Sequence, residues 1–424
     1  MSLSIAVHKL LISLFWGAVS LTLYTYVGYP VWAFLRSRLW PRPWQQATIF
    51  PNVSVILVVH NGAALLLQKI NQLLSLDYPR DRIEFIVVSD GCTDATNRIL
   101  RSNPFVRSII CPERRGKAAG LNVGIQNATG EILVFLDVRQ RLESTSFHYL
   151  LSNFTDPGIG CAGGEVLLSD NGHDQETRAV SSMYWRYEKW IRQCESRVDS
   201  PVGVSGAFYA VRRQLVCTLP EACLLDDVLQ PLSIIRKGYR SVLDARAVVY
   251  DVPPRNFEDE FRRKVRTLAG NFQLLKLAPW LLSSENRLRF ELISHKLMRL
   301  IVPVLLVILL ATSAMLAIRS QLYTALFAAQ LLFYLAAALG TCRGVPILAQ
   351  IAGAARAFCM MNIAVVVGFY RFISTRRPLW SIWIPTAPPP EASTVSIEQT
   401  PHADAGVGLS IEPLSSEQTD WSTS

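Results

Sequence analysis

The chain has 424 residues, of which 50% are hydrophobic, and it carries a net charge of +9. The mean hydropathy of +0.25 is high, and the apolar residues gather in a few long segments, which excludes an ordinary soluble globular protein. No RNA- or DNA-binding motif interleaves with the basic residues, so they indicate binding of phosphates and lipid head groups and not of nucleic acid.

The first segment is a predicted membrane helix over residues 1–40. No charged residue lies between Lys9 and Arg36, a run long enough to cross roughly 30 Å of hydrocarbon. A cleaved signal peptide is the alternative, because Ala18-Val19-Ser20 weakly resembles a cleavage site. The apolar run continues to Leu35, however, which is too long for the core of a signal peptide.

Residues 50–255 alternate between predicted strands and helices. Three apolar strands end in polar residues: Val53–Val59 in His60 and Asn61, Glu84–Val88 in Ser89 and Asp90, and Glu131–Leu136 in Asp137. Open α/β sheets bind ligands at the carboxyl ends of their strands. The pattern therefore predicts a ligand-binding α/β domain with its site at this edge.

Asp137 is a candidate metal ligand within that edge. A carboxylate that follows a buried strand is costly unless it meets a cation. Arg139 is one such cation, and Mg²⁺ holding a diphosphate is another. The sequence alone leaves both open.

Two further motifs carry chemistry. Gly116-Lys117, preceded by two arginines, suits a loop that approaches phosphates, although the spacing of a Walker A loop is absent. Asp226 and Asp227 stand at the start of a predicted helix. They could cap that helix or include a general base.

In this order the motifs resemble the membrane-embedded family 2 glycosyltransferases, which include hyaluronan, chitin and poly-N-acetylglucosamine synthases. The resemblance covers about residues 50–275. It implies a GT-A fold, that is, a Rossmann-like α/β domain that binds a nucleotide diphospho-sugar, here joined to transmembrane helices. It also implies an enzyme of the hexosyltransferase class.

The resemblance assigns the UDP-sugar donor to residues of four motifs: His60, Asn61, Asp90, Lys117, Asn122 and Asp137. Asp137 would hold Mg²⁺ or Mn²⁺. The family's Asp-x-Asp motif reads Asp137-Val138-Arg139 here, so the second carboxylate is missing.

The same resemblance names Asp227 as the catalytic base, and the spacing from Asp227 to Gly238 agrees with the family. The Gln-x-x-Arg-Trp signature of processive members appears as Arg263-Lys-Val-Arg266-Thr267. Arg266, the one retained residue, would stabilise the leaving diphosphate. The loss of the other two puts long-chain processivity in doubt more than transfer itself.

The C-terminal half is predicted to lie at the membrane. Residues 256–290 carry an apolar stripe typical of an interfacial helix, although an ordinary amphipathic surface helix has the same pattern: Phe261, Val265, Leu268, Phe272 and Leu275. Residues 291–375 form a predicted transmembrane region, in which Arg356 interrupts the last apolar run, so that this run either crosses or is re-entrant. The tail, 386–424, is predicted to be disordered.

The sequence thus predicts an integral protein of the plasma or inner membrane with a cytoplasmic catalytic domain. It would move sugar with inversion from a UDP-sugar, such as UDP-N-acetylglucosamine, to a polysaccharide or lipid acceptor. A non-processive lipid glycosyltransferase is one alternative, and a catalytically silent scaffold or export component is another. Three C-terminal spans would put the C-terminus outside, yet Arg371, Arg376 and Arg377 favour the inside.

Overall fold

The computed structural model describes residues 2–168, 175–252, 257–339, 346–375 and 379–382. Within these ranges one mixed sheet has the strand order β3-β2-β1-β4-β7-β6-β8-β5. The strands are β1 (Val53–Val59), β2 (Ile83–Asp90), β3 (Arg107–Cys111), β4 (Ile132–Leu136), β5 (Arg141–Leu142), β6 (Ile159–Leu168), β7 (Phe208–Arg212) and β8 (Arg240–Asp251).

The parallel half of the sheet, β3-β2-β1-β4, builds the predicted strand-end edge. Its strands are continuous apolar runs because both faces of the sheet are covered. Helix α5 (Lys117–Asn127) covers one face, and α3 (Ala63–Leu74) packs on the other. The parallel register pairs Val59 with Ser89, and Leu57 with Leu136. His60, Asp90 and Asp137 therefore leave the sheet at the same edge.

The other half of the sheet is antiparallel at β7 and carries α6 (Ser146–Ser152), α7 (Gln175–Val198) and α8 (Asp226–Arg236). The C-terminal part of α7 buries Ile191 and Cys194 against Tyr29 and Ala33 of the first membrane segment. This part of the helix therefore packs one face into a core, while Tyr187, Glu188 and Arg192 line a cavity.

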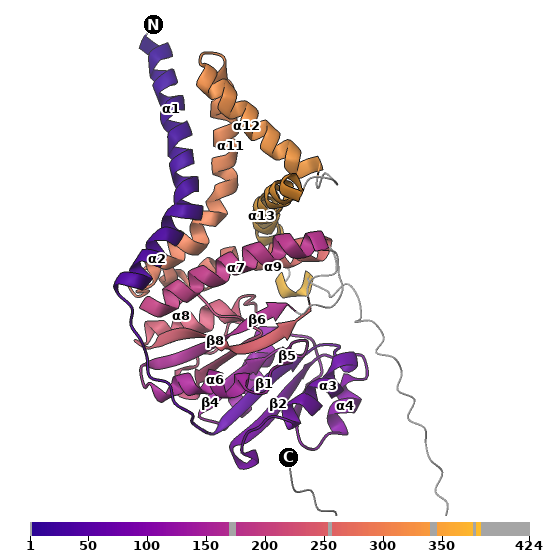
Figure 1. The fold of residues 1–424 in the computed structure, drawn as a ribbon. Coiled ribbons are helices and arrows are strands. Elements are labelled where there is room, and N and C mark those ends of the chain that lie inside the picture. Colours follow the sequence, from indigo (N-terminus) through magenta and orange to yellow (C-terminus); the bar gives the residue numbers. More distant parts are fainter. Residues whose placement is uncertain (1, 169–174, 253–256, 340–345, 376–378, 383–424) are drawn as a thin grey trace, which may run out of the picture. The chain divides into compact units, whose positions relative to one another are not determined.

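Within the described residues four helices are long and apolar enough to cross a membrane, the fourth being Ala352–Ser374. The first consists of α1 (Ser2–Leu23), a π-helical turn η1 (Tyr24–Gly28) and α2 (Tyr29–Leu39). Next come α11 (Met298–Ala317), which packs beside α1 through Phe15 and Leu305, and α12 (Gln321–Leu339). These helices extend away from the sheet (Figure 1).

A buried polar network ties this first segment to the catalytic domain. The Tyr29 hydroxyl donates to Glu195 Oε1 at 2.5 Å, and His295 Nδ1 lies 2.8 Å from the same oxygen. Tyr29, Glu195 and His295 belong to α2, α7 and the π-helix η6 (Leu292–Leu297) that precedes α11. Satisfied networks of this kind fix the relative placement of elements, because breaking them leaves buried polar groups without partners.

Helix α9 (Phe257–Leu277) packs along α13 (Pro346–Ser374) through its apolar stripe. Val265 and Leu268 are buried against Ala364 and Val365. Further along, a Cβ added at Gly368 would lie 3.0 Å from the backbone nitrogen of Ala269, so glycine allows the two backbones to approach closely. The stripe thus faces another helix of the same chain.

Arg356 interrupts the apolar run of α13 but does not interrupt the helix. Its guanidinium lies 4.5 Å from the centre of the Phe257 ring at the start of α9. The ring accepts the cation and α13 continues to Ser374. The apolar run after Arg356 is therefore part of one continuous helix, and whether it crosses the membrane or is re-entrant stays a prediction.

After α13 the chain returns to the catalytic domain. The short helix η7 (Leu379–Ile382) places the Trp380 ring over Gly116, where an added Cβ would lie 2.8 Å from the ring. The Arg114 guanidinium lies 5.5 Å from the centre of the same ring. Arg356 within α13 thus contacts α9, and Trp380, after the end of α13, contacts the Gly116 loop. An end of α13 on this side would agree with the preference of Arg371, Arg376 and Arg377 for the inside. The predicted disordered tail, 386–424, lies outside the described residues.

We therefore expect α13 to end on the same face of the membrane as the catalytic domain. In a variant whose native cysteines are replaced, single cysteines at Thr375 and at Asp81, on the catalytic domain, should react with a membrane-impermeant thiol reagent from the same side. A cysteine at Arg319, between α11 and α12, should react from the opposite side. Labelling of Thr375 together with Arg319 would mean that α13 crosses the membrane.

Candidate active site

The ammonium group of Lys117 joins the strand-end edge to the start of α8. Its Nζ atom donates to Asp137 Oδ1 at 2.9 Å and to the Gly206 carbonyl at 3.3 Å, and it lies 3.8 Å from Asp226 Oδ2. Burial alone would lower the pKa of Lys117, but Asp137 and Asp226 hold it above its ordinary value. Burial alone would likewise raise the pKa of Asp137, but the charge of Lys117 holds it low. Both groups therefore stay charged at neutral pH.

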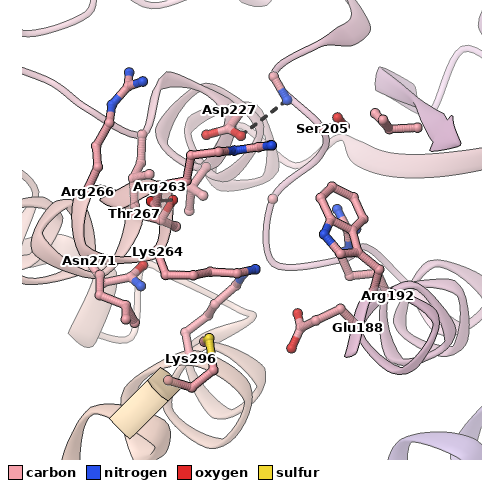
Figure 2. Close-up of a pocket in the computed structure, with 18 of the residues that line it drawn as sticks. Glu188, Arg192, Ser205, Asp227, Arg263, Lys264, Arg266, Thr267, Asn271 and Lys296 are labelled. Atoms are coloured by element: carbon pink, nitrogen blue, oxygen red, sulfur yellow. Dashed lines mark hydrogen bonds between the residues drawn. The ribbon is translucent and has the colours of Figure 1, made fainter. Parts of the chain in front are cut away.

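Asp227 follows Asp226 in the chain, and its environment differs from that of Lys117 and Asp137. Its Oδ2 accepts a hydrogen bond from the backbone nitrogen of Gly206 at 3.2 Å (Figure 2). A Cβ at position 206 would lie 3.1 Å from that oxygen, so glycine permits the approach. Burial and the neighbouring charge of Asp226 raise the pKa of Asp227 to about 6. A carboxylate poised near neutral pH suits a general base.

These carboxylates line a cavity of about 750 Å³ between the sheet edge and the membrane helices. From the catalytic domain Lys117, Asp137 and Asp227 reach it, together with Arg266 of α9. Its far wall comes from membrane-side elements: Tyr26, Lys296, Arg299, Phe358, Met361 and Val365. The cavity therefore has charged groups on both sides, and its far wall adds apolar side chains.

Four predicted donor residues do not line this cavity and instead order the loops around it. Asp90 accepts hydrogen bonds from the backbone nitrogens of Arg115 (2.7 Å) and Gly116 (2.9 Å), and His60 Nδ1 lies 2.7 Å from the Asp90 carbonyl oxygen. These contacts fix the loop that delivers Lys117.

The other two are the asparagines. The Asn61 side chain accepts a hydrogen bond from the Thr93 backbone nitrogen at 2.8 Å. Asn122 bonds to both backbone groups of Leu219, at 2.8 and 2.9 Å. The donor contacts of His60, Asn61, Asp90 and Asn122 stay predictions.

The metal prediction depends on the carboxylates within reach of Asp137. Arg139, which replaces the second aspartate of the motif, pairs with Asp251 at 2.8 Å. Across the described ranges, no group of three or more His, Cys, Asp or Glu residues could hold a metal. Mg²⁺ is usually held by one or two carboxylates together with substrate phosphates and water. Asp137 alone therefore fits a metal ion that arrives with a diphosphate.

Sequence reasoning missed several residues of the cavity because they come from distant parts of the chain. Glu188 and Arg192 lie on α7, whereas Lys296 lies on η6; all three extend into the same space as Lys264 (Figure 2). A lysine beside the apolar run of α11 was the one available signal, since charges there are rare and usually functional.

Comparison with known proteins identifies the domain. Residues 54–216 match the model of glycosyl transferase family 2. These residues form a family 2 glycosyltransferase domain. The chain is 24% identical over 263 residues to the probable glycosyltransferase YdaM of Bacillus subtilis, and 21% identical over 231 residues to a poly-beta-1,6-N-acetyl-D-glucosamine synthase of Staphylococcus aureus. The matches cover 57% and 53% of this chain, and 61% and 55% of those relatives.

A solved structure supports the fold over a longer range. The mannosyltransferase PcManGT of Pyrobaculum calidifontis, solved with GDP-Man and Mn²⁺, is 23% identical, with a TM-score of 0.67 over 86% of this chain and 100% of its own. The predicted GT-A fold and the predicted family 2 glycosyltransferase domain are confirmed, and the described residues include candidate membrane-spanning helices. The residues of the site and its donor and acceptor are predictions.

The proximity of Asp226 and Asp227 predicts a pH effect in this glycosyltransferase. The predicted role of Asp227 as general base requires its deprotonated form, so nucleotide release should rise as the pH rises through the pKa of Asp227. Asp226→Asn removes the neighbouring negative charge that raises this pKa, so the acid limb of the profile should move to lower pH. The measurement is kcat/KM as a function of pH for the unchanged protein and for Asp226→Asn, with the exposed Asp81→Asn as control. If the acid limb moved equally in Asp226→Asn and in Asp81→Asn, the assignment of Asp227 as the base would be contradicted.

Proposed function

We propose that the protein transfers a sugar from a UDP-sugar, such as UDP-N-acetylglucosamine, to an acceptor hydroxyl, with inversion at the anomeric carbon. The observation that supports the proposal is that a charged pair and a carboxylate with a raised pKa line the same cavity. Lys117 and Asp137 form a charged pair on one side, and Asp227, with its raised pKa, faces the same space. One side thus suits a diphosphate and the other suits a base.

In the proposed mechanism Asp227 removes the proton of the acceptor hydroxyl as its oxygen attacks the anomeric carbon. The bond from that carbon to the diphosphate oxygen breaks, and the electron pair leaves with the nucleotide. Lys117 and Arg266 would stabilise the charge that develops there. Arg266 is close enough to Asp137 that its charge contributes to the low pKa of that carboxyl.

Asp137 would hold Mg²⁺ or Mn²⁺, which would supply further positive charge against the diphosphate. His60, Asn61 and Asp90 would lie toward the uridine, and Asn122 would position the phosphate loop through Leu219. A single displacement needs no covalent nucleophile on the enzyme.

The catalytic domain would face the cytoplasm of the plasma or inner membrane. Likeness to a polysaccharide synthase supports a glycan acceptor. Residues of the membrane-side helices, such as Phe358 and Met361, line the cavity, which supports a lipid as the alternative acceptor of the sugar.

Replacement of the base tests the proposal directly. Asp227→Asn should retain binding of the UDP-sugar but lower transfer by roughly 10²–10⁴-fold, the usual contribution of a positioned base. The measurement is UDP release together with calorimetric donor binding by the purified chain, with Asp81→Asn as control. Full turnover in Asp227→Asn would show that another residue is the base. Absence of release with every donor tried would favour the silent scaffold.

A second prediction concerns the metal. Asp137→Ala should weaken UDP binding strongly in Mn²⁺ and much less in EDTA, because the metal couples the carboxylate to the diphosphate. Calorimetric titration with UDP under both conditions provides the measurement, with Asp251→Ala as the comparison at the neighbouring Arg139 pair. If Asp137→Ala lowered the affinity for UDP equally in Mn²⁺ and in EDTA, Asp137 would act through Lys117 alone.

A further inference from the structure

The cavity holds more positive charge than its own carboxylates neutralise. Among the described residues eight cations, Arg192 included, and six carboxylates line it. Four of the cations form ion pairs with carboxylates: Lys117 with Asp137, Arg139 with Asp251, Lys264 with Glu260, and Arg299 with Glu188. Among the residues that the structure describes, Arg263, Arg266 and Lys296 form no ion pair, and Asp227 is the lining carboxylate without one. Such a surplus favours anionic ligands.

The donor diphosphate accounts for only part of this surplus. Arg266 acts on Asp137, at the end where the diphosphate is proposed to bind. Lys296 belongs to η6, at the start of the α11 membrane segment, and its charge acts on Asp227. Arg263 extends from α9 alongside Asp227 (Figure 2). Lys296 and Arg263 are therefore placed to meet an anion next to the base.

The wall beyond these cations contains several apolar side chains together with the polar groups of Arg299 and Asn362. Phe358, Met361 and Val365 of α13 line it with Tyr26 of the first membrane segment, and the rings of Tyr26 and Phe358 lie 5.4 Å apart. These residues come from helices that are apolar enough to lie in a membrane. A ligand with an anionic group followed by hydrocarbon would meet the cations near the base and the apolar side chains of this wall.

We propose that the acceptor is a phospholipid whose head group carries a free hydroxyl beside its phosphate, with the phosphate on Lys296 and Arg263. The proposal rests on the sugar transfer proposed above and specifies its acceptor. The presence of a base argues for a hydroxyl nucleophile, because a phosphate oxygen that attacked directly would have no proton to lose at neutral pH.

The transfer balances with this acceptor. The head-group oxygen forms a bond to the anomeric carbon and its proton passes to Asp227. The carbon–oxygen bond to the diphosphate breaks, and the electron pair leaves with UDP. The phosphate on Lys296 and Arg263 takes no part in bond making and only positions the hydroxyl.

Four ligands separate the contributions to binding. Phosphatidylglycerol carries both phosphate and hydroxyl, diacylglycerol carries the hydroxyl alone, phosphatidylcholine carries the phosphate alone, and glycerol 3-phosphate lacks the hydrocarbon. Native mass spectrometry of the full chain in detergent measures binding without any donor. We expect phosphatidylglycerol to bind best, and Lys296→Gln to weaken it by roughly tenfold to a hundredfold, as for loss of one charged hydrogen bond. Lys296→Arg should restore binding.

The matched control is Lys276→Gln, an exposed lysine on α9 that does not line the cavity. Equal binding of diacylglycerol and phosphatidylglycerol, or equal effects of Lys276→Gln and Lys296→Gln, would overturn the proposal. Tight binding of glycerol 3-phosphate alone would show a site for soluble phosphates and would also overturn it.

Product analysis separates this proposal from the proposed function. Vesicles of each lipid are incubated with UDP-N-acetylglucosamine, UDP-glucose or GDP-mannose, and glycolipids are sought by mass spectrometry. We expect glycosylated phosphatidylglycerol and no product from phosphatidylcholine. Sugar transfer to oligosaccharides without lipid binding would retain the transferase and refute the phospholipid acceptor. Selective phosphatidylglycerol binding without nucleotide release from any donor would retain the lipid site and refute sugar transfer.

Discussion

The ion pair between Lys117 and Asp137 is the interaction on which the arrangement of the active site depends. It joins the first turn of α5 to the end of β4, and Lys117 also contacts the Gly206 loop and lies near Asp226 of α8. Both side chains are about one-third exposed, at 30% and 37%, so the pair acts mainly by fixing the positions of the groups around it. The donor loop, the strand edge and the helix that carries the base are therefore held together through one ammonium group.

The loop that carries Lys117 is itself held from two directions. Asp90 accepts two of its backbone N–H groups, and Trp380 lies against Gly116 on its outer side. Gly116 has a φ of 93°, a conformation that side chains with a Cβ rarely adopt. The segment after α13, which contains Trp380, thus contributes to the geometry of the loop that carries Lys117. It lies more than two hundred residues from that loop in the sequence.

The membrane-side helices form part of the cavity as well as an anchor. The stripe of α9 packs on α13, which leaves Arg263 and Arg266 free to extend toward the carboxylates. The π-helix η6 places Lys296 at the same cavity while His295, its neighbour, is tied to Glu195. One helix thereby links membrane anchoring to the chemistry, which is the physical basis for proposing a membrane-borne acceptor.

The sequence by itself determined the strands, their polar ends and the membrane segments, because each follows from local periodicity and from uninterrupted apolar length. It also identified Lys117, Asp137 and Asp227, which follow recognisable strand, loop and helix boundaries. Only the tertiary structure decided that Asp90 and Asn122 order loops, that Arg356 lies within a continuous helix, and that Lys296 and Arg263 share a cavity with the base. The cause is physical: these outcomes depend on contacts between residues far apart in the chain, and a local pattern carries no information about which distant partner a buried polar group will meet.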